Sequence, residues 1–133
     1  MKLAIGMIAL FSTLAFAGKA DREFLKNELG PAISTSEAAV KKACGCAMKI
    51  KTASSIATEA DMKQVKYLVE EVATGATKYC TDADSKKAVC KMKQLELAKG
   101  TESKFSFSGS KGVAMTDGQM NPSFDMMTAQ LDK

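Results

Sequence analysis

The clearest pattern in the chain is an apolar stripe with helical spacing between residues 59 and 79. At 100° per residue, its side chains fall within an arc of about 120°: they are Met62, Val65, Leu68, Val69, Val72, Ala76 and Tyr79. Thr58 and Asp61 have the spacing of a capping box at the start of this segment. The sequence therefore predicts a long amphipathic helix over residues 59–79 that packs one face on a sheet or on another helix.

Two shorter helices are predicted before the long one. Asp21 is a suitable N-cap for a helix over residues 22–29, and the Gly-Pro pair at residues 30–31 is a common helix ending. Ser34 opens a Ser-x-x-Glu capping box, which predicts a second helix over residues 35–43. We therefore expect two separate helices, divided at the proline.

Alternation of apolar and polar residues predicts strands in the other segments. Strands are expected over residues 46–51, 92–99, 104–108 and 113–116, and glycine-containing turns separate the last three. These last three are interpreted as an antiparallel meander. Residues 125–131 are interpreted as a further edge strand.

These elements together predict an α+β fold. One long amphipathic helix packs on a mostly antiparallel sheet of four or five strands, and two disulfides link one end. The first strand, the long helix and the strand after residue 90 form a β-α-β unit, in which a helix rising ~30 Å brings the chain back to the start of the first strand. These two strands are expected to run parallel, with the right-handed crossover that is usual for such a unit. The alternative is an all-α, disulfide-linked hairpin, because residues 85–98 also fit a helical face.

Four cysteines lie at the borders of the predicted elements: Cys44, Cys46, Cys80 and Cys90. An even number of cysteines in an exported chain is first interpreted as disulfides. A bridge between Cys44 and Cys46 would close a very small ring, so we expect each of them to pair with Cys80 or Cys90. The β-α-β geometry brings all four to one end of the domain, but the spacing does not decide which cysteine joins which.

The first 17 residues have the features of a signal peptide. Lys2 provides a positive charge, residues 3–14 are apolar or small, and Ala15-Phe16-Ala17 fits a cleavage site. The apolar run is shorter than the roughly 20 residues of a transmembrane helix. We therefore expect a single small secreted domain over residues 18–133, without a membrane span, in the periplasm or outside the cell.

Composition excludes several classes of function. Residues 1–17 contain one lysine and no acid, so removing them lowers the net charge from +4 to +3. The basic residues form no dense patch with aromatic platforms, which argues against nucleic-acid binding. The chain has no histidine, so Ser-His and Cys-His pairs are excluded. We interpret the protein as a non-enzyme and expect no cofactor.

The leading hypothesis is an exported, disulfide-stabilised binding module of a bacterial envelope. Its partner would be an unknown protein or an anionic envelope component, contacted through the strand edges and the hairpin at residues 104–116. Two alternatives remain open. One is thiol–disulfide exchange through the Cys-Gly-Cys motif at residues 44–46. The other is copper(I) binding by thioethers, for which the C-terminal segment offers Met115, Met120, Met126 and Met127.

Overall fold

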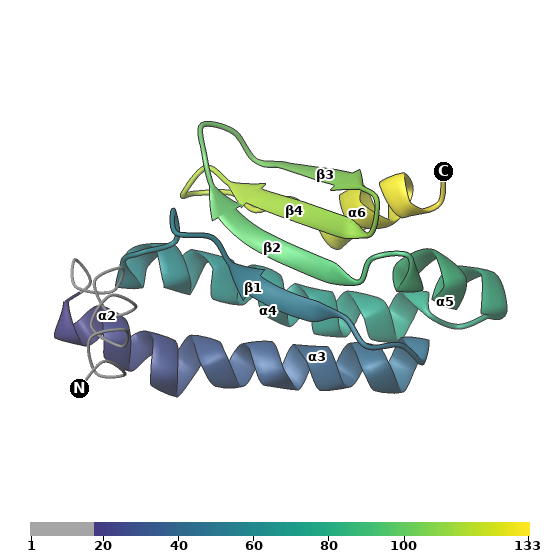
Figure 1. Ribbon diagram of the computed structural model, residues 1–133, viewed down its shortest axis with the longest axis horizontal. Helices are drawn as coiled ribbons and strands as arrows, with labels where there is room; N and C mark the ends of the chain where they lie inside the picture. The colour runs from purple at the N-terminus through teal and green to yellow at the C-terminus, as the bar shows by residue number, and fades with distance from the viewer. Residues whose placement is uncertain (1–17) are drawn as a thin grey trace, which may run out of the picture.

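The computed structural model describes residues 18–133, so the predicted signal peptide lies outside the described residues. The described elements form an α+β fold in which helices pack on one side of a four-stranded sheet (Figure 1). In chain order they are α2 (Lys19–Phe24), the π-helical turn η1 (Leu25–Leu29), α3 (Gly30–Cys44), β1 (Lys49–Thr52), α4 (Glu59–Tyr79), α5 (Ala83–Cys90), β2 (Gln94–Lys99), β3 (Lys104–Ser108), β4 (Lys111–Thr116) and α6 (Phe124–Leu131). The predicted fold class is confirmed, and the strand at residues 94–99 contradicts the all-α alternative.

Helix α4 has the bounds that the apolar stripe predicts. The Thr58 side chain caps it by accepting a hydrogen bond from the Asp61 amide at 3.2 Å. Six residues of the stripe are buried: Met62, Val65, Leu68, Val69, Val72 and Ala76. They form the centre of the hydrophobic core, with α3 alongside α4 (Figure 1). Burying apolar surface is favourable by about 25 cal/mol per Å², so burial of this stripe stabilises the packing of α4 on the sheet and α3.

The sheet is mixed, in the order β1-β2-β4-β3. β1 and β2 are parallel, as the β-α-β unit predicts, but β2 and β4 are also parallel, and only β3 and β4 are antiparallel. The predicted meander is therefore wrong in its strand order, and the sheet is mixed rather than mostly antiparallel, because only one of its three strand pairs is antiparallel. β4 occupies the position between β2 and β3.

Small side chains explain why β4 lies in the interior of the sheet. Gly112 and Ala114 both face the core on this strand and are buried. A Cβ at Gly112 would lie 2.8 Å from the Phe105 ring, which shows that the ring of the edge strand covers the glycine. The bulkier β3 can therefore pack its phenylalanines over β4 from the sheet edge.

The predicted break at Gly30-Pro31 is wrong, because α2, η1 and α3 follow one another without interruption. Proline removes an amide and crowds the carbonyl four residues earlier. The wider π turn accommodates it, with the Gly30 amide donating to the Leu25 carbonyl. The capping box predicted at Ser34 is also wrong, since Ser34 and Glu37 are both inside α3. The Glu37 carboxylate instead accepts a hydrogen bond from the Ile50 amide on β1 at 2.8 Å.

The predicted edge strand at residues 125–131 is a helix, α6. Ser123 caps it by accepting from the Met126 amide at 3.2 Å. Its buried side chains recur at intervals of three and four, at Phe124, Met127, Thr128 and Leu131. Helical spacing explains this burial better than alternation does, because Ala129 would be on the buried face of a strand and is exposed here.

Asp21 joins the beginning of the fold to the start of α4. Its Oδ2 accepts a hydrogen bond from the Gly18 amide at 2.9 Å, and its Oδ1 accepts from the Glu59 amide at 2.6 Å. One carboxylate thus satisfies a free amide at two helix N-termini, where negative charge is favourable.

Candidate binding surface

The four cysteines meet at one end of the domain and form two bridges. Cys44 pairs with Cys80 and Cys46 pairs with Cys90, with Cα–Cα distances of 5.2 and 5.8 Å. Gly45, at φ 82°, adopts the left-handed conformation that ends α3 and reverses the chain between the two bridges. The prediction that Cys44 and Cys46 each pair with Cys80 or Cys90 is confirmed.

This pairing bears on the redox alternative. That hypothesis rested on a strained bridge within Cys-Gly-Cys, and the structure joins each of these cysteines to a different helix instead. Residues 18–133 contain no free cysteine. Cys44 and Cys80 are buried, whereas Cys46 and Cys90 are partly exposed. Thiol exchange stays an untested prediction.

The four methionines of the copper alternative occupy different environments. Met127 is fully buried in the core, while Met120 and Met126 are 65% and 44% exposed. Met115 is half-buried on β4 and covers Gly100. Within the described residues, no group of three or more Cys, Asp or Glu side chains is placed to hold a metal ion. Copper binding also remains an untested prediction.

One face of the sheet packs on the helices, and the other is open. Along each strand, alternate residues point to opposite faces. Ile50, Leu95, Leu97, Ala114 and Phe105 face the core and are buried. Their neighbours in the same strands form the open face, and most of them are polar. Figure 1 views the sheet from this side, with β1 in front of α4.

The open face carries lysines on three of its four strands. We define the lysine face as Lys49 and Lys51 of β1, Lys104 of β3 and Lys111 of β4, all of them exposed. In the sheet register, Lys49 aligns with Gln94 of β2, which in turn aligns with Lys111. Strands are about 4.8 Å apart and alternate residues about 7 Å apart. These lysines therefore belong to one continuous surface.

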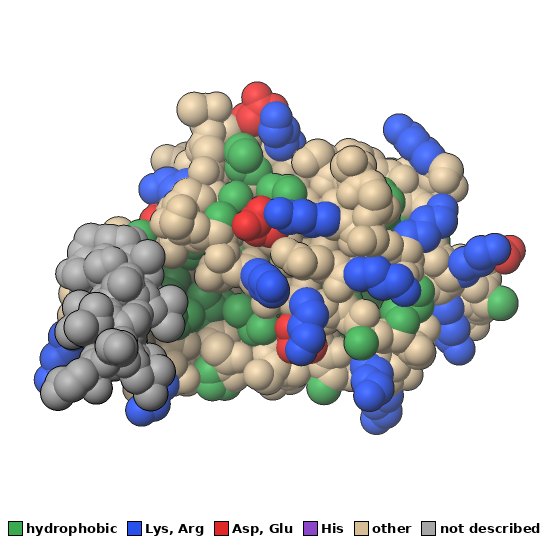
Figure 2. Space-filling model, viewed as in Figure 1, with side chains coloured by type: hydrophobic (Ala, Val, Ile, Leu, Met, Phe, Trp, Pro, Cys, Tyr) green, Lys and Arg blue, Asp and Glu red, His purple; other side chains and the backbone are tan. Residues whose placement is uncertain are grey.

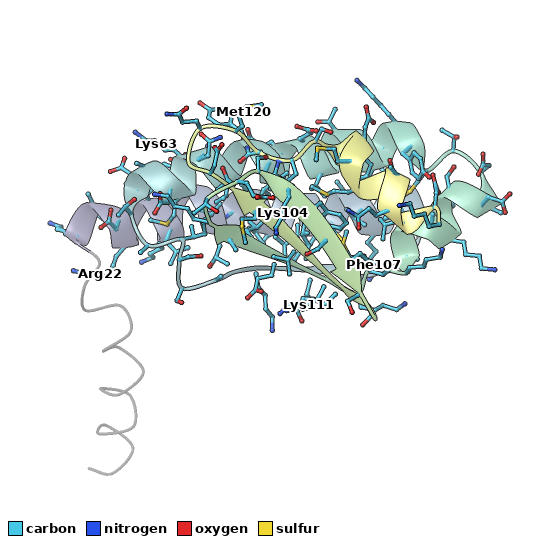
Figure 3. The ribbon with its side chains drawn as sticks, turned by 90° about the horizontal axis from the view of Figure 1, so that it is seen from above. Arg22, Lys63, Lys104, Phe107, Lys111 and Met120 are labelled. Carbon is cyan, nitrogen blue, oxygen red and sulfur yellow. A yellow bond between two sulfur atoms is a disulfide. The ribbon has the colours of Figure 1, made fainter. Side chains whose placement is uncertain are left out.

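The acids of this surface are few. Glu96, the only acid of the four strands, pairs with Lys111 at 3.1 Å, and Glu102 in the preceding turn lies 3.9 Å from Lys104. No ion pair within the described residues involves Lys49 or Lys51. Figure 2 shows basic side chains spread across this side of the molecule with fewer acidic ones between them. Figure 3 shows Lys111 pointing away from the helices.

Both edges of the sheet are partly closed by side chains. On the β1 edge, the Glu37 carboxylate accepts a hydrogen bond from the Ile50 amide. On the β3 edge, the Gln130 side chain of α6 donates a hydrogen bond to the Phe105 carbonyl at 2.6 Å. Edge strands with free backbone groups are templates for further strand pairing. These two contacts each satisfy one backbone group at an edge, so both edges offer fewer free groups for strand pairing.

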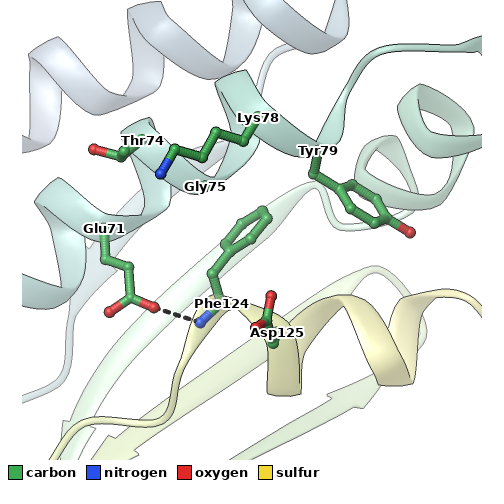
Figure 4. Close-up of a pocket in the computed structure, with 7 residues that line it drawn as sticks. All are labelled: Glu71, Thr74, Gly75, Lys78, Tyr79, Phe124 and Asp125. Atoms are coloured by element: carbon green, nitrogen blue, oxygen red, sulfur yellow. Dashed lines mark hydrogen bonds between the residues drawn. The ribbon is translucent and has the colours of Figure 1, made fainter.

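A groove of about 430 Å³ separates α4 from α6 (Figure 4). Its lining consists of Glu71, Thr74, Gly75, Lys78, Tyr79, Phe124 and Asp125. Its polar groups already serve the packing of α6. Glu71 accepts the Phe124 amide at 2.7 Å, and the Tyr79 hydroxyl donates to Asp132 at 2.5 Å. The latter hydrogen bond raises the pKa of Tyr79 to about 12. We therefore interpret this groove as a packing seam.

A second groove, of about 230 Å³, lies between α3 and β1 next to the lysine face. Lys41 and Lys49 both line it, so α3 adds a further positive charge beside β1. No acidic residue occurs in the sequence between Glu37 and Glu59. The positive surface therefore extends from the sheet toward the end of α3.

The alternation of apolar and polar residues in the strands predicts that Lys49, Lys51 and Lys104 are exposed, and the structure confirms this. The sequence does not show that these lysines lie on the same face of the sheet, because that depends on the strand order. The only sequence signal for the lysine face is the occurrence of lysines at alternate positions of the strands.

Comparisons with protein-family models, with curated proteins and with solved structures found no match to this chain. None of the helices within residues 18–133 has the combination of length and hydropathy that a membrane span requires. The two disulfides are compatible with an oxidising compartment such as the periplasm or the extracellular space.

Proposed function

We propose that this protein is an exported binding module that contacts an anionic component of the bacterial envelope through the lysine face. The observation that carries the proposal is the open sheet surface with its four exposed lysines and few acids. Export is supported by the signal-peptide pattern of residues 1–17 and by the two bridges.

Charge is the basis of the expected recognition. The lysine face holds its basic groups on a rigid sheet, so binding orders few backbone groups and loses little conformational entropy. Opposite charges attract over a Debye length, which is about 10 Å at 0.1 M salt and about 3 Å at 1 M. Binding should therefore weaken steeply as salt is added.

Sheet lysines also keep edge strands from pairing with other chains, and helix-end lysines complement the helix dipole. The dipole explains Lys41 and Lys42 in the last turn of α3. It does not explain lysines on the flat side of three strands. The contribution of these lysines to binding can be measured by exchanging them as a group.

The test compares two variants with the same change in net charge. In the face variant, Lys49, Lys51, Lys104 and Lys111 are replaced by Gln. In the control variant, four exposed lysines outside the sheet are replaced by Gln: Lys19, Lys26, Lys63 and Lys78. Each protein is mixed with isolated bacterial envelope, and the bound fraction is measured by sedimentation at rising NaCl concentration.

We expect the natural protein and the control variant to sediment with the envelope at low salt and the face variant to remain in solution. Equal losses in both variants would show that only net charge matters. Undiminished binding of the face variant would place the contact elsewhere. Either result contradicts the proposal.

A further inference from the structure

The middle of the lysine face contains three apolar residues and Glu96, whose carboxylate is neutralised by Lys111 at 3.1 Å. Val113 and Met115 of β4 are half-buried there, and Ala98 of β2, which aligns with Met115, is 9% exposed. The lysines lie around this middle, on the two edge strands and at the start of β4. A lysine side chain has a four-carbon apolar stem that can lie on such a surface while its ammonium group reaches outward.

The positions of these charges are spread in two dimensions. Lys49 and Lys51 lie at the β1 edge, and Lys104 lies at the opposite edge on β3. Lys41 extends the positive charge beyond β1, where it lines the same groove as Lys49. A linear polyanion needs a row of charges or a groove that follows its backbone. Positive charges distributed around a flat sheet surface instead match a planar array of anionic groups.

We propose that the partner of the lysine face is the surface of an anionic phospholipid bilayer. The protein would lie on the bilayer with its open sheet face against the headgroups. This inference rests on the proposed function and names the class of its partner. The ammonium groups would contact lipid phosphates, while Val113 and Met115 would lie at the level of the headgroups without inserting into the hydrocarbon.

The structure also indicates how much each lysine should contribute to bilayer binding. A lysine near an anionic bilayer contributes about fivefold in partitioning. Lys111 and Lys104 have carboxylate partners, at 3.1 and 3.9 Å, and should contribute less than Lys49 and Lys51. Loss of the four charges should therefore reduce binding on the order of 100-fold.

The experiment measures co-sedimentation with vesicles of two compositions. One contains phosphatidylglycerol and phosphatidylcholine, and the other contains phosphatidylcholine alone. The natural protein, the face variant and the control variant defined above are compared, and far-UV circular dichroism verifies that each is folded. Soluble polyphosphate is measured as a separate ligand.

We expect the natural protein and the control variant to bind only the anionic vesicles and to dissociate at 0.5 M NaCl. The face variant should bind on the order of 100-fold more weakly. Equal binding to both vesicle compositions, or unchanged binding by the face variant, would overturn the inference.

A third result separates this inference from the proposed function. If the anionic vesicles are not bound but envelope or polyphosphate is bound through the lysine face, the bilayer is excluded and the binding module remains. If neither vesicles, polyphosphate nor envelope is bound, both proposals fail.

Discussion

Replacing Gly75 by Ala tests how closely α6 packs on α4. A Cβ at this position would lie 2.6 Å from two carbon atoms of the Phe124 ring and 3.0 Å from its Cβ. Carbon atoms in contact are normally about 3.5–4.0 Å apart. Because the conflict reaches the Cβ of Phe124, rotating the ring would not remove all of it, and the backbone of α6 would have to move by a few tenths of an ångström.

Two effects of opposite sign determine the result. In a helix interior, Ala is favoured over Gly by about 1 kcal/mol. Forcing a new side-chain atom into space that a neighbour already occupies costs about 1–3 kcal/mol. The upper end applies here, because movement of α6 would also stretch the hydrogen bond between the Phe124 amide and Glu71. We therefore expect Gly75→Ala to lower the free energy of unfolding by about 2 kcal/mol.

Urea denaturation followed by circular dichroism measures this difference, and Thr77→Ala on the exposed side of α4 is the control for helix propensity. Replacing Phe124 by Ala removes the conflict with the ring and leaves only the 3.0 Å contact with the Cβ of residue 124. In that background, Gly75→Ala should therefore be clearly less destabilising than in the natural protein. A stabilising effect of Gly75→Ala in the natural protein would refute the reasoning.

Two further predictions concern the ends of the domain. Replacing Cys46 and Cys90 together by Ala removes a bridge between residues 44 positions apart and should cost about 4 kcal/mol in urea denaturation; an unchanged midpoint would show that the bridge is not structural. Burial alone would raise the pKa of Asp61, but hydrogen bonds from Lys99 and Thr58 and the charge of Lys99 lower it below 3.8. Its stabilising contribution is therefore present above the unfolded pKa and lost as pH falls through the folded pKa. Asp61→Asn should flatten the dependence of stability on pH below about 4; an unaltered acid profile would contradict this.

The sequence predicts α4 and the disulfide end well because both depend on local spacing. The apolar stripe of α4 is long and uninterrupted, so helical periodicity has no competing interpretation. The β-α-β argument then follows from the lengths of a helix and a strand, and it brings Cys44 and Cys80 together as observed.

The errors arise where a local signal is overridden by packing. Gly30-Pro31 is a sound helix ending in isolation, yet here a π turn carries the helix through the proline. α6 is short enough that alternation and helical spacing both fit its residues, and contact with α4 decides between them. The order of β2, β4 and β3 depends on which strand has side chains small enough for the interior, such as Gly112 beneath Phe105.

The lysine face could be predicted only in part for the same reason. Lys49 and Lys51 alternate with buried residues, so their exposure follows from the sequence. Their position on the same surface as Lys104 and Lys111 follows from a strand order that no local pattern shows. Surfaces built across several strands are therefore harder to predict than the strands themselves.

The contact between Gly18 and Asp21 has a consequence for the predicted cleavage after Ala17. The Gly18 nitrogen is 2.9 Å from Asp21 Oδ2. Cleavage after Ala17 would turn this neutral amide into a charged amino terminus, so that the hydrogen bond becomes an ion pair. Asp21 also caps α4 through the Glu59 amide. Removal of the predicted signal peptide would thus add a charge–charge contact to the folded domain, and a protein with residues before Gly18 would lack this contact.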